Sequence, residues 1–179
     1  MRILHVLAQL PAKTGSGVYF TNVIEGLKKY KHEQAALYGT TPEYNFNILD
    51  TVYEVEFEGK DLDFPIVGMS DIMPYNNTLY RDMTEEMIND WQNAFREKLI
   101  KAKEEFNPDV IITHHLWMLS SIVCEIFNDK KIIGVCHNTD IRQAEKNPAM
   151  KDKYVKNLDK LDKILALSSG VIEGISNIY

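Results

Sequence analysis

The chain has 179 residues, of which 45% are hydrophobic and 26% charged, and its formal net charge is -6. This composition is typical of a globular protein with enough apolar side chains for one core, so we expect a single domain over residues 1–179. An acidic chain without a basic face is not expected to bind nucleic acid. No apolar run reaches the length of a membrane span.

The two cysteines, Cys124 and Cys136, lie inside apolar segments. This placement predicts buried thiols of a reducing compartment rather than a disulfide framework, and the expected location is cytoplasmic. The segment from Met1 to Pro11 contains a short apolar run, but it lacks the small-residue cleavage pattern of a secretory signal.

The amino-terminal pattern predicts a strand, a glycine-containing loop and a helix. Residues 2–8 form a buried strand, residues 11–17 a loop that ends in Gly15-Ser16-Gly17, and a helix begins near Val18. Glycine lets a backbone approach an anion closely, and the unpaired N–H groups of a helix start are donors for it, so this arrangement suits a phosphate. A tight turn without a ligand is the alternative.

A nicotinamide-binding fingerprint is not matched. It would need a small residue where Phe20 stands and an acidic residue where Tyr38-Gly39 follows the second strand. Further strands are predicted over residues 33–37, 51–57 and 64–67, with a surface excursion over residues 59–77. Thr84 then caps a long helix that ends at Phe106 and carries one apolar face.

Two short β-branched runs, over residues 109–115 and from residue 131, flank an apolar helix over residues 116–127. Such a unit predicts parallel strands joined by a crossover helix, whose carboxyl ends open onto a ligand-binding crevice. Polar side chains gather there: His114, His115, His137, Asn138, Thr139 and Asp140. Because neighbouring residues on a strand face opposite ways, one of the two adjacent histidines is predicted to pack into the core unless the strand has already ended.

The remaining segment is predicted to contain a polar loop broken by Pro148 and followed by a short helix, all within residues 141–158. A last strand over residues 163–168 and a helix over residues 171–178 complete the chain. The alternation of strands and helices predicts an α/β fold, with a Rossmann-like parallel sheet flanked by helices on both faces.

Four strings resemble family-four glycosyltransferases in order and spacing. They are Gly15-Ser16-Gly17, the segment Pro108–Ile111 with Thr113-His114-His115, Cys136–Ile141, and Asp162–Ser168. The resemblance spans nearly the whole chain but only the amino-terminal half of such an enzyme, the acceptor-side Rossmann-like domain of the GT-B fold. The second domain, which grips the nucleotide-sugar, is absent from these residues.

The resemblance implies retaining transfer of a sugar from a nucleotide-sugar donor, usually without a metal or another cofactor, in the cleft between the domains. It implies that the amides of Gly15, Ser16 and Gly17 approach the donor diphosphate and that His137 is catalytic, beside the donor sugar. The implied partners are a nucleotide-sugar, a small or glycan acceptor, and the chain's own second domain. The implied acceptor pocket is lined by His115, Asn138, Thr139, Asp140 and Arg142. The family often has glycine where Asn138 stands.

Several alternatives stay open. His5 is interpreted as a core residue or as one that supports the site from behind, and a metal site built from His114, His115, His137 and Asp140 fits no compact ligand spacing. A stand-alone Rossmann-like binding module without catalysis is the second functional hypothesis. No amphipathic docking surface is evident, so neither a lipid acceptor nor association with a membrane surface is favoured.

Overall fold

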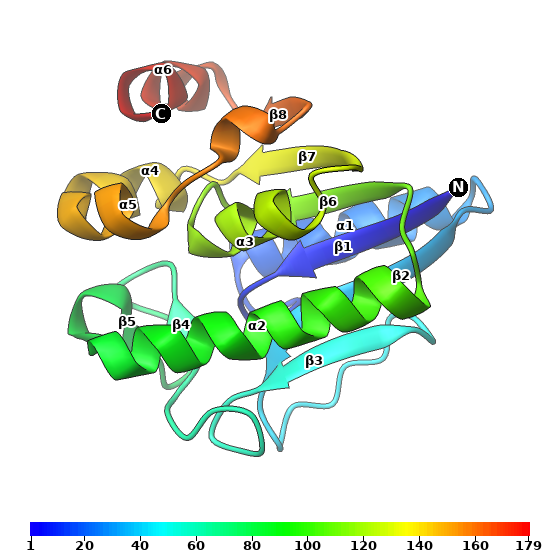
Figure 1. Cartoon of the computed structure of the whole chain (residues 1–179), viewed down its shortest axis with the longest axis horizontal. Helices are drawn as coiled ribbons and strands as arrows, with labels where there is room; N and C mark the ends of the chain where they lie inside the picture. The colour runs from blue at the N-terminus through cyan, green and yellow to red at the C-terminus, as the bar shows by residue number, and fades with distance from the viewer.

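The computed structural model describes residues 1–179 and is built around a six-stranded, fully parallel sheet (Figure 1). The sheet order is β3-β2-β1-β6-β7-β8. The sheet strands are β1 Arg2–Leu7, β2 Glu33–Thr40, β3 Val52–Glu56, β6 Val110–His114, β7 Lys131–Cys136 and β8 Lys163–Ala166. The helices are α1 Gly15–Lys28, α2 Glu85–Glu105, α3 Met118–Ile126, α4 Thr139–Lys146, α5 Pro148–Tyr154 and α6 Ser169–Ile178, with short 3-10 turns at Tyr80–Asp82 and Leu158–Lys160.

The strand order reverses beside β1. The chain starts in the middle of the sheet, runs outward through β2 and β3, and then returns to the other side of β1 with β6, β7 and β8. Open parallel sheets bind ligands at such a switch point, outside the carboxyl ends of the strands. In this chain the α1 start and the two loops after β6 and β7 meet there.

Helices cover both faces of the sheet, as the sequence predicted. Side chains alternate across each strand, so Leu4 and Val6 of β1 enter the large core shared with α2 and α3. Leu7 points to the opposite face and packs with Phe20 and Ile24 of α1. Figure 1 shows α2 and α3 in front of the sheet and α1 behind it. The predicted Rossmann-like α/β fold is therefore confirmed.

Polar side chains determine where several helices begin. Thr14, Thr84 and Ser168 each accept a backbone N–H of the first turn that follows, so they act as N-caps of α1, α2 and α6. The prediction that α1 begins near Val18 was wrong by three residues, because the cap is Thr14. Gly15-Ser16-Gly17 is consequently the first helical turn rather than a loop.

Two segments contain more regular structure than the pattern predicted. The predicted fourth strand is shifted to β4, Val67–Gly68, which pairs in parallel with β5, Thr78–Leu79, in a separate two-stranded sheet. Residues 141–158 form two helices rather than a loop and one helix, because Pro148 occupies the first turn of α5, where its missing N–H costs nothing.

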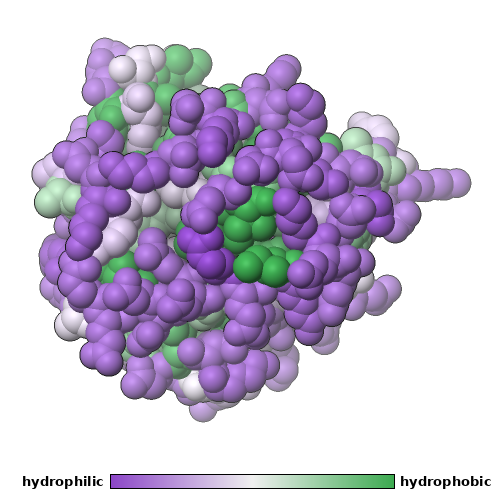
Figure 2. All heavy atoms as spheres, in the orientation of Figure 1, coloured by the Kyte–Doolittle hydropathy of each residue, from purple (hydrophilic) through white to green (hydrophobic).

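The last strand of the sheet, β8, and the segment after it expose apolar side chains. Ile164 and Leu165 of β8 are exposed, as are Leu167 and Ile172 beside them. Figure 2 shows hydrophobic atoms at the α6 end of the molecule, above a largely hydrophilic face. Strands of parallel sheets are usually covered on both faces, so this edge is under-covered for its fold. None of the helices combines the length and the apolar character needed to cross a bilayer.

Candidate functional site

A cavity of about 310 Å³ opens at the carboxyl edge of the sheet, beside the switch point. Its walls come from the segment after β1, the first turns of α1, the segment after β4, the β7–α4 junction and the end of β8. The lining residues are Gln9, Gly15, Ser16, Tyr19, Met69, Ser70, His137, Thr139 and Leu167. The cavity thus brings two of the predicted phosphate-binding residues, Gly15 and Ser16 but not Gly17, beside the predicted catalytic histidine.

The amino terminus of α1 contributes unpaired backbone donors. Gly15 and Ser16 occupy the first two helical positions, whose N–H groups have no carbonyl partner inside the helix. The positive end of the helix dipole adds a favourable field for an anion. The Ser16 hydroxyl lies 3.1 Å from the Thr14 hydroxyl, which holds the entrance to the turn in place.

Gly17, unlike Gly15 and Ser16, does not line the cavity. Its N–H donates to the Thr14 hydroxyl at 3.0 Å, and the residue is buried behind the cavity wall. A Cβ atom at Gly17 would lie 2.8 Å from the Leu10 carbonyl oxygen and 2.9 Å from the Ala12 nitrogen. Close approach of two backbone segments therefore requires glycine here.

Gln9 lines the cavity and carries a buried side-chain amide. Its side chain is buried, with 1% of the residue exposed, and its amide nitrogen Nε2 has no hydrogen-bond partner in the protein. A buried amide without a partner is costly, so such a group in the wall of a cavity indicates a site that a polar ligand completes.

The histidines cluster because β6 ends at His114. His115 adopts the left-handed conformation with φ of 70°, so the alternation of the strand no longer separates the two side chains. The His115 ring centroid lies 4.7 Å from that of His137, and the His114 centroid lies 5.2 Å from it. The prediction that one of the adjacent histidines packs into the core holds for both, because His114 and His115 are 1% and 3% exposed and neither lines the cavity. A bulky residue in this conformation stores strain, which is a feature of functional sites.

All three clustered imidazoles are held neutral. Burial lowers the pKa of His137 and of His115 to about 3 each. Burial, together with the neighbouring imidazoles, also lowers the pKa of His114 well below its ordinary value. At neutral pH these rings are therefore donors and acceptors of hydrogen bonds rather than cations. His5, which is fully buried as predicted, bonds Gln34 through Nε2 at 2.9 Å and belongs to the core beneath them.

Of the five predicted acceptor residues, only Thr139 lines the cavity. Thr139 lines the cavity, with its hydroxyl 3.3 Å from His115 Nδ1, and Asn138 precedes it with a positive φ of 68° that also suits glycine. Asp140 is fully buried, and its carboxylate accepts the N–H groups of Leu116 and His137 at 2.8 and 3.1 Å. Arg142 lies on the exposed side of α4, outside the cavity.

Five lining residues were not found by sequence reasoning: Gln9, Tyr19, Met69, Ser70 and Leu167. Gln9 and Tyr19 flank the glycine turn, so their nearness to it was a signal in the sequence. Met69 and Ser70 belong to the excursion after β4, and only the tertiary fold brings them to the cavity. Tyr19 also contacts the rings of His114 and His137 edge-on.

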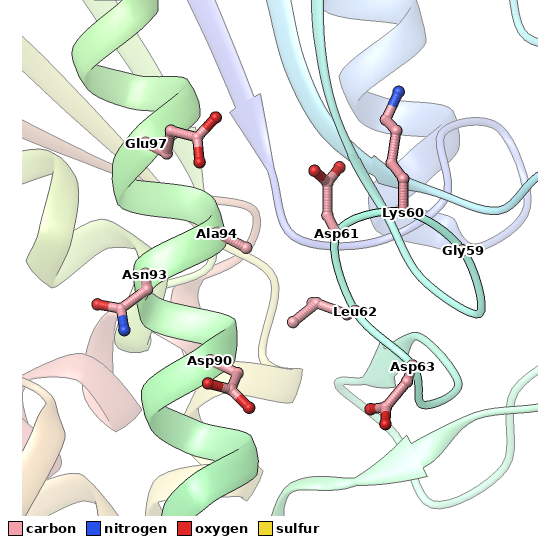
Figure 3. A pocket seen from close by; sticks show the side chains of 9 residues that line it. All are labelled: Gly59, Lys60, Asp61, Leu62, Asp63, Asp90, Asn93, Ala94 and Glu97. Atoms are coloured by element: carbon pink, nitrogen blue, oxygen red, sulfur yellow. The ribbon is translucent and has the colours of Figure 1, made fainter.

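A larger cavity, of about 480 Å³, lies between α2 and the loop after β3. Figure 3 shows Asp61 and Asp63 of the loop across a hollow from Asp90 and Glu97 of the helix. Asp61 is already engaged, because it accepts from Lys98 at 3.1 Å and from the Glu56 amide at 2.9 Å. No three potential ligands in the chain are arranged to share a metal ion, so this hollow is a polar surface groove.

Comparison with known proteins extends the description of the fold. No protein-family model and no curated protein matches the sequence. Among solved structures, UDP-GlcNAc 2-epimerase from Methanocaldococcus jannaschii and the lipopolysaccharide outer core galactosyltransferase WaaB each give a TM-score of 0.57, at 9% and 14% identity. Each covers 99% of this chain, which corresponds to 42% of their own length.

Sucrose-phosphate synthase from Thermosynechococcus elongatus is also similar, with a TM-score of 0.50 and 10% identity over 93% of this chain. The chain covers 48% of that structure. It therefore spans less than half the length of each of these three proteins. At such identities the likeness is one of fold: the chain has the Rossmann-like architecture of a domain found in GT-B glycosyltransferases and epimerases.

Proposed function

We propose that this chain is the acceptor-binding half of a retaining glycosyltransferase, which transfers a sugar from a nucleotide-sugar donor to a small or glycan acceptor. One observation carries the proposal. A single cavity at the switch point combines the unpaired amides of the α1 start with the imidazole of His137. A phosphate-binding turn beside a neutral hydrogen-bonding side chain is the combination that such a donor needs.

The donor diphosphate would lie against the start of α1. Gly15 and Ser16 offer their N–H groups, and the unpaired Gln9 amide offers another donor in the same wall. These uncharged donors and the helix dipole suit an anion without a metal ion. Turnover by the complete protein should accordingly persist in the presence of EDTA.

His137 would act as a hydrogen-bond donor to an oxygen of the donor sugar or its phosphate. Because burial lowers its pKa to about 3, the ring is neutral when it meets the substrate and is not a general acid at neutral pH. A fixed donor in a half-buried position is worth more than the same group in water. It would stabilise the charge that develops as the glycosidic bond to phosphate breaks.

The acceptor would enter along the start of α4. Thr139 lines the cavity and can contact an acceptor hydroxyl, whereas the buried His115 would act through Thr139, whose hydroxyl lies 3.3 Å from its Nδ1. Asn138 adopts the left-handed conformation in the turn before α4, and Asp140 ties this turn to the loop after β6 through the amides of His137 and Leu116. Arg142, on the exposed side of α4, would bind an anionic part of an acceptor that extends beyond the cavity.

The exposed apolar edge fits a two-domain enzyme. Ile164, Leu165 and Ile172 line a hollow of about 380 Å³ between β8 and α6. We propose that a second α/β domain, which grips the nucleotide-sugar, packs beside this edge and closes the cavity. The chain alone would then have little or no activity.

The complete product of the gene tests this function. Incubated with a panel of UDP-, GDP- and ADP-sugars and a mixture of small and glycan acceptors, it should form a glycoside whose anomeric configuration is that of the donor. His137→Ala should lower kcat by about 10² to 10³-fold, as for loss of a transition-state hydrogen bond. Gly26→Ala, on the exposed side of α1 with nothing within 4 Å of the new methyl group, is the matched control.

Four results would contradict the proposal. An epimerised nucleotide-sugar without a new glycoside would assign the fold to isomerisation, and inversion of the anomeric centre would remove the retaining mechanism. Unchanged turnover in His137→Ala would remove that residue from the reaction. A protein that binds a ligand but converts no nucleotide-sugar would favour the non-catalytic module.

A further inference from the structure

The hydrogen bond between two histidines of the site restricts which of their ring nitrogens can carry a proton. His114 Nδ1 lies 3.0 Å from His137 Nε2, and the two rings are stacked with 18° between their planes. Both rings are neutral at neutral pH, so each carries one N–H. Either His114 donates from Nδ1 and His137 accepts at Nε2, or His137 donates from Nε2 and His114 accepts at Nδ1.

The surroundings of His114 distinguish the two arrangements. The residue is 1% exposed, and its second ring nitrogen, Nε2, is buried without a hydrogen-bond partner. The edge-on ring of Phe20, 5.3 Å from its centroid, helps to enclose it. If His137 were the donor, the proton of His114 would have to sit on that enclosed nitrogen. Buried N–H groups without a partner are rarer than buried acceptors without one, so the first arrangement is favoured.

His137 has the opposite surroundings. Its Nε2 is occupied by His114, whereas its Nδ1 has no partner in the protein and is not among the buried unpaired nitrogens. The ring lines the cavity and the residue is only half-buried. A proton on Nδ1 would therefore be available to water or to a ligand.

We infer that His114 is a positioning residue that fixes His137 in the tautomer with its proton on Nδ1, so that His137 presents a hydrogen-bond donor to the cavity. The partner of one imidazole nitrogen decides which nitrogen carries the proton. The inference deepens the proposed function, because a bare Nδ1 could only accept a hydrogen bond and would repel an oxygen without a proton, such as that of a phosphate.

The tautomer can be measured without substrate. In protein labelled with ¹⁵N in the histidine rings, long-range ¹H–¹⁵N correlation at pH 7 separates protonated from bare ring nitrogens. We expect a protonated Nδ1 and a bare Nε2 for both His114 and His137. In His114→Phe, His137 should shift toward the Nε2–H form that free imidazole side chains favour. In His114→Asn, whose amide nitrogen replaces Nδ1 as a donor, the Nδ1–H form should be kept.

His115→Asn is the matched control. Its ring contacts His137 without a hydrogen bond, and asparagine tolerates the positive φ, so the His137 tautomer should not change. A protonated Nε2 on His137 in the unmodified protein would overturn the inference, even if His114→Phe did not fold. An unchanged tautomer in a folded His114→Phe protein would overturn it as well.

A kinetic measurement separates this inference from the proposed function. In the complete gene product, His114→Phe should lower kcat about 10- to 100-fold with little change in KM, the size found when a group that orients a reacting ligand is lost, and His114→Asn should restore most of it. If the tautomers are as expected but no nucleotide-sugar is converted, the proposed function fails while the role of His114 in fixing the ring stands.

Discussion

Replacing Asp140 by alanine separates a structural role from a direct contact with an acceptor. The carboxylate is fully buried at the start of α4 and accepts N–H groups from two different strand ends. One is Leu116, after β6, at 2.8 Å, and the other is His137, after β7, at 3.1 Å. The side chain therefore joins the two loops that carry the histidines.

The expected loss of stability follows from these two bonds. A hydrogen bond to a charged group contributes about 1.5–3 kcal/mol, and each buried N–H left without a partner adds to the cost. Asp140→Ala should therefore lower the free energy of unfolding by about 3–5 kcal/mol, a large part of the 5–15 kcal/mol typical of a domain. For a chain of this length, the melting temperature should fall by about 10 °C.

Urea unfolding followed by circular dichroism measures the change. The control is Glu145→Ala on the same helix, where the side chain is exposed and forms no hydrogen bond or ion pair, so the effect should stay within about 0.5 kcal/mol. The amides of Leu116 and His137 should also lose protection from hydrogen exchange in Asp140→Ala alone. Equal stability of the two variants would refute the assignment and leave the carboxylate free to contact an acceptor.

Three further predictions concern the same half of the molecule. Gly17→Ala should destabilise the fold by about 1–3 kcal/mol in urea unfolding, because the new methyl group meets backbone atoms of Leu10 and Ala12. Gly26→Ala on the same helix should instead stabilise the fold by about 0.5–1 kcal/mol. A gain of stability in both variants would contradict the packing described. Burial lowers the pKa of His5 to about 4. As the pH is lowered from about 6.5 to 4, His5 is therefore protonated in the unfolded chain but not in the folded one, and the free energy of unfolding decreases. His5→Asn should reduce that slope between pH 6.5 and 5 by up to about 1.4 kcal/mol per pH unit, and an unchanged slope would mean that His5 titrates normally. Burial also raises the pKa of Cys124 and Cys136 to about 12, so iodoacetamide at pH 8 should modify them only after unfolding; rapid labelling of native protein would contradict this.

The fold was predictable because its elements alternate and their apolar patterns are simple. The buried run of β1, the one-sided stripe of α2 and the unit of β6, α3 and β7 each indicated the correct element. The exact ends of the helices, by contrast, depend on single side chains. Thr14 caps α1, which begins three residues earlier than predicted, and Pro148 starts a helix instead of ending one.

The site was predictable in outline but not in detail. Gly15, Ser16, His137 and Thr139 stand at strand ends and a helix start, where the sequence pattern alone indicates a crevice. The left-handed backbone of His115 brings two adjacent histidines to one place, and no pattern of residue types reports a single dihedral angle. Met69 reaches the cavity from a distant excursion, where its carbonyl accepts a hydrogen bond from Gln143.

The most direct test of a diphosphate site at the start of α1 is an amide NMR titration of this chain with UDP, with uridine as the control that lacks phosphates. We expect saturable shifts of the Gly15 and Ser16 amides and of the Gln9 side-chain amide with UDP, and none with uridine. The Gly26 amide should not move in either case. If these amides do not shift at millimolar UDP, or if shifts are confined to the groove of Asp61 and Asp90, the start of α1 is not a diphosphate site.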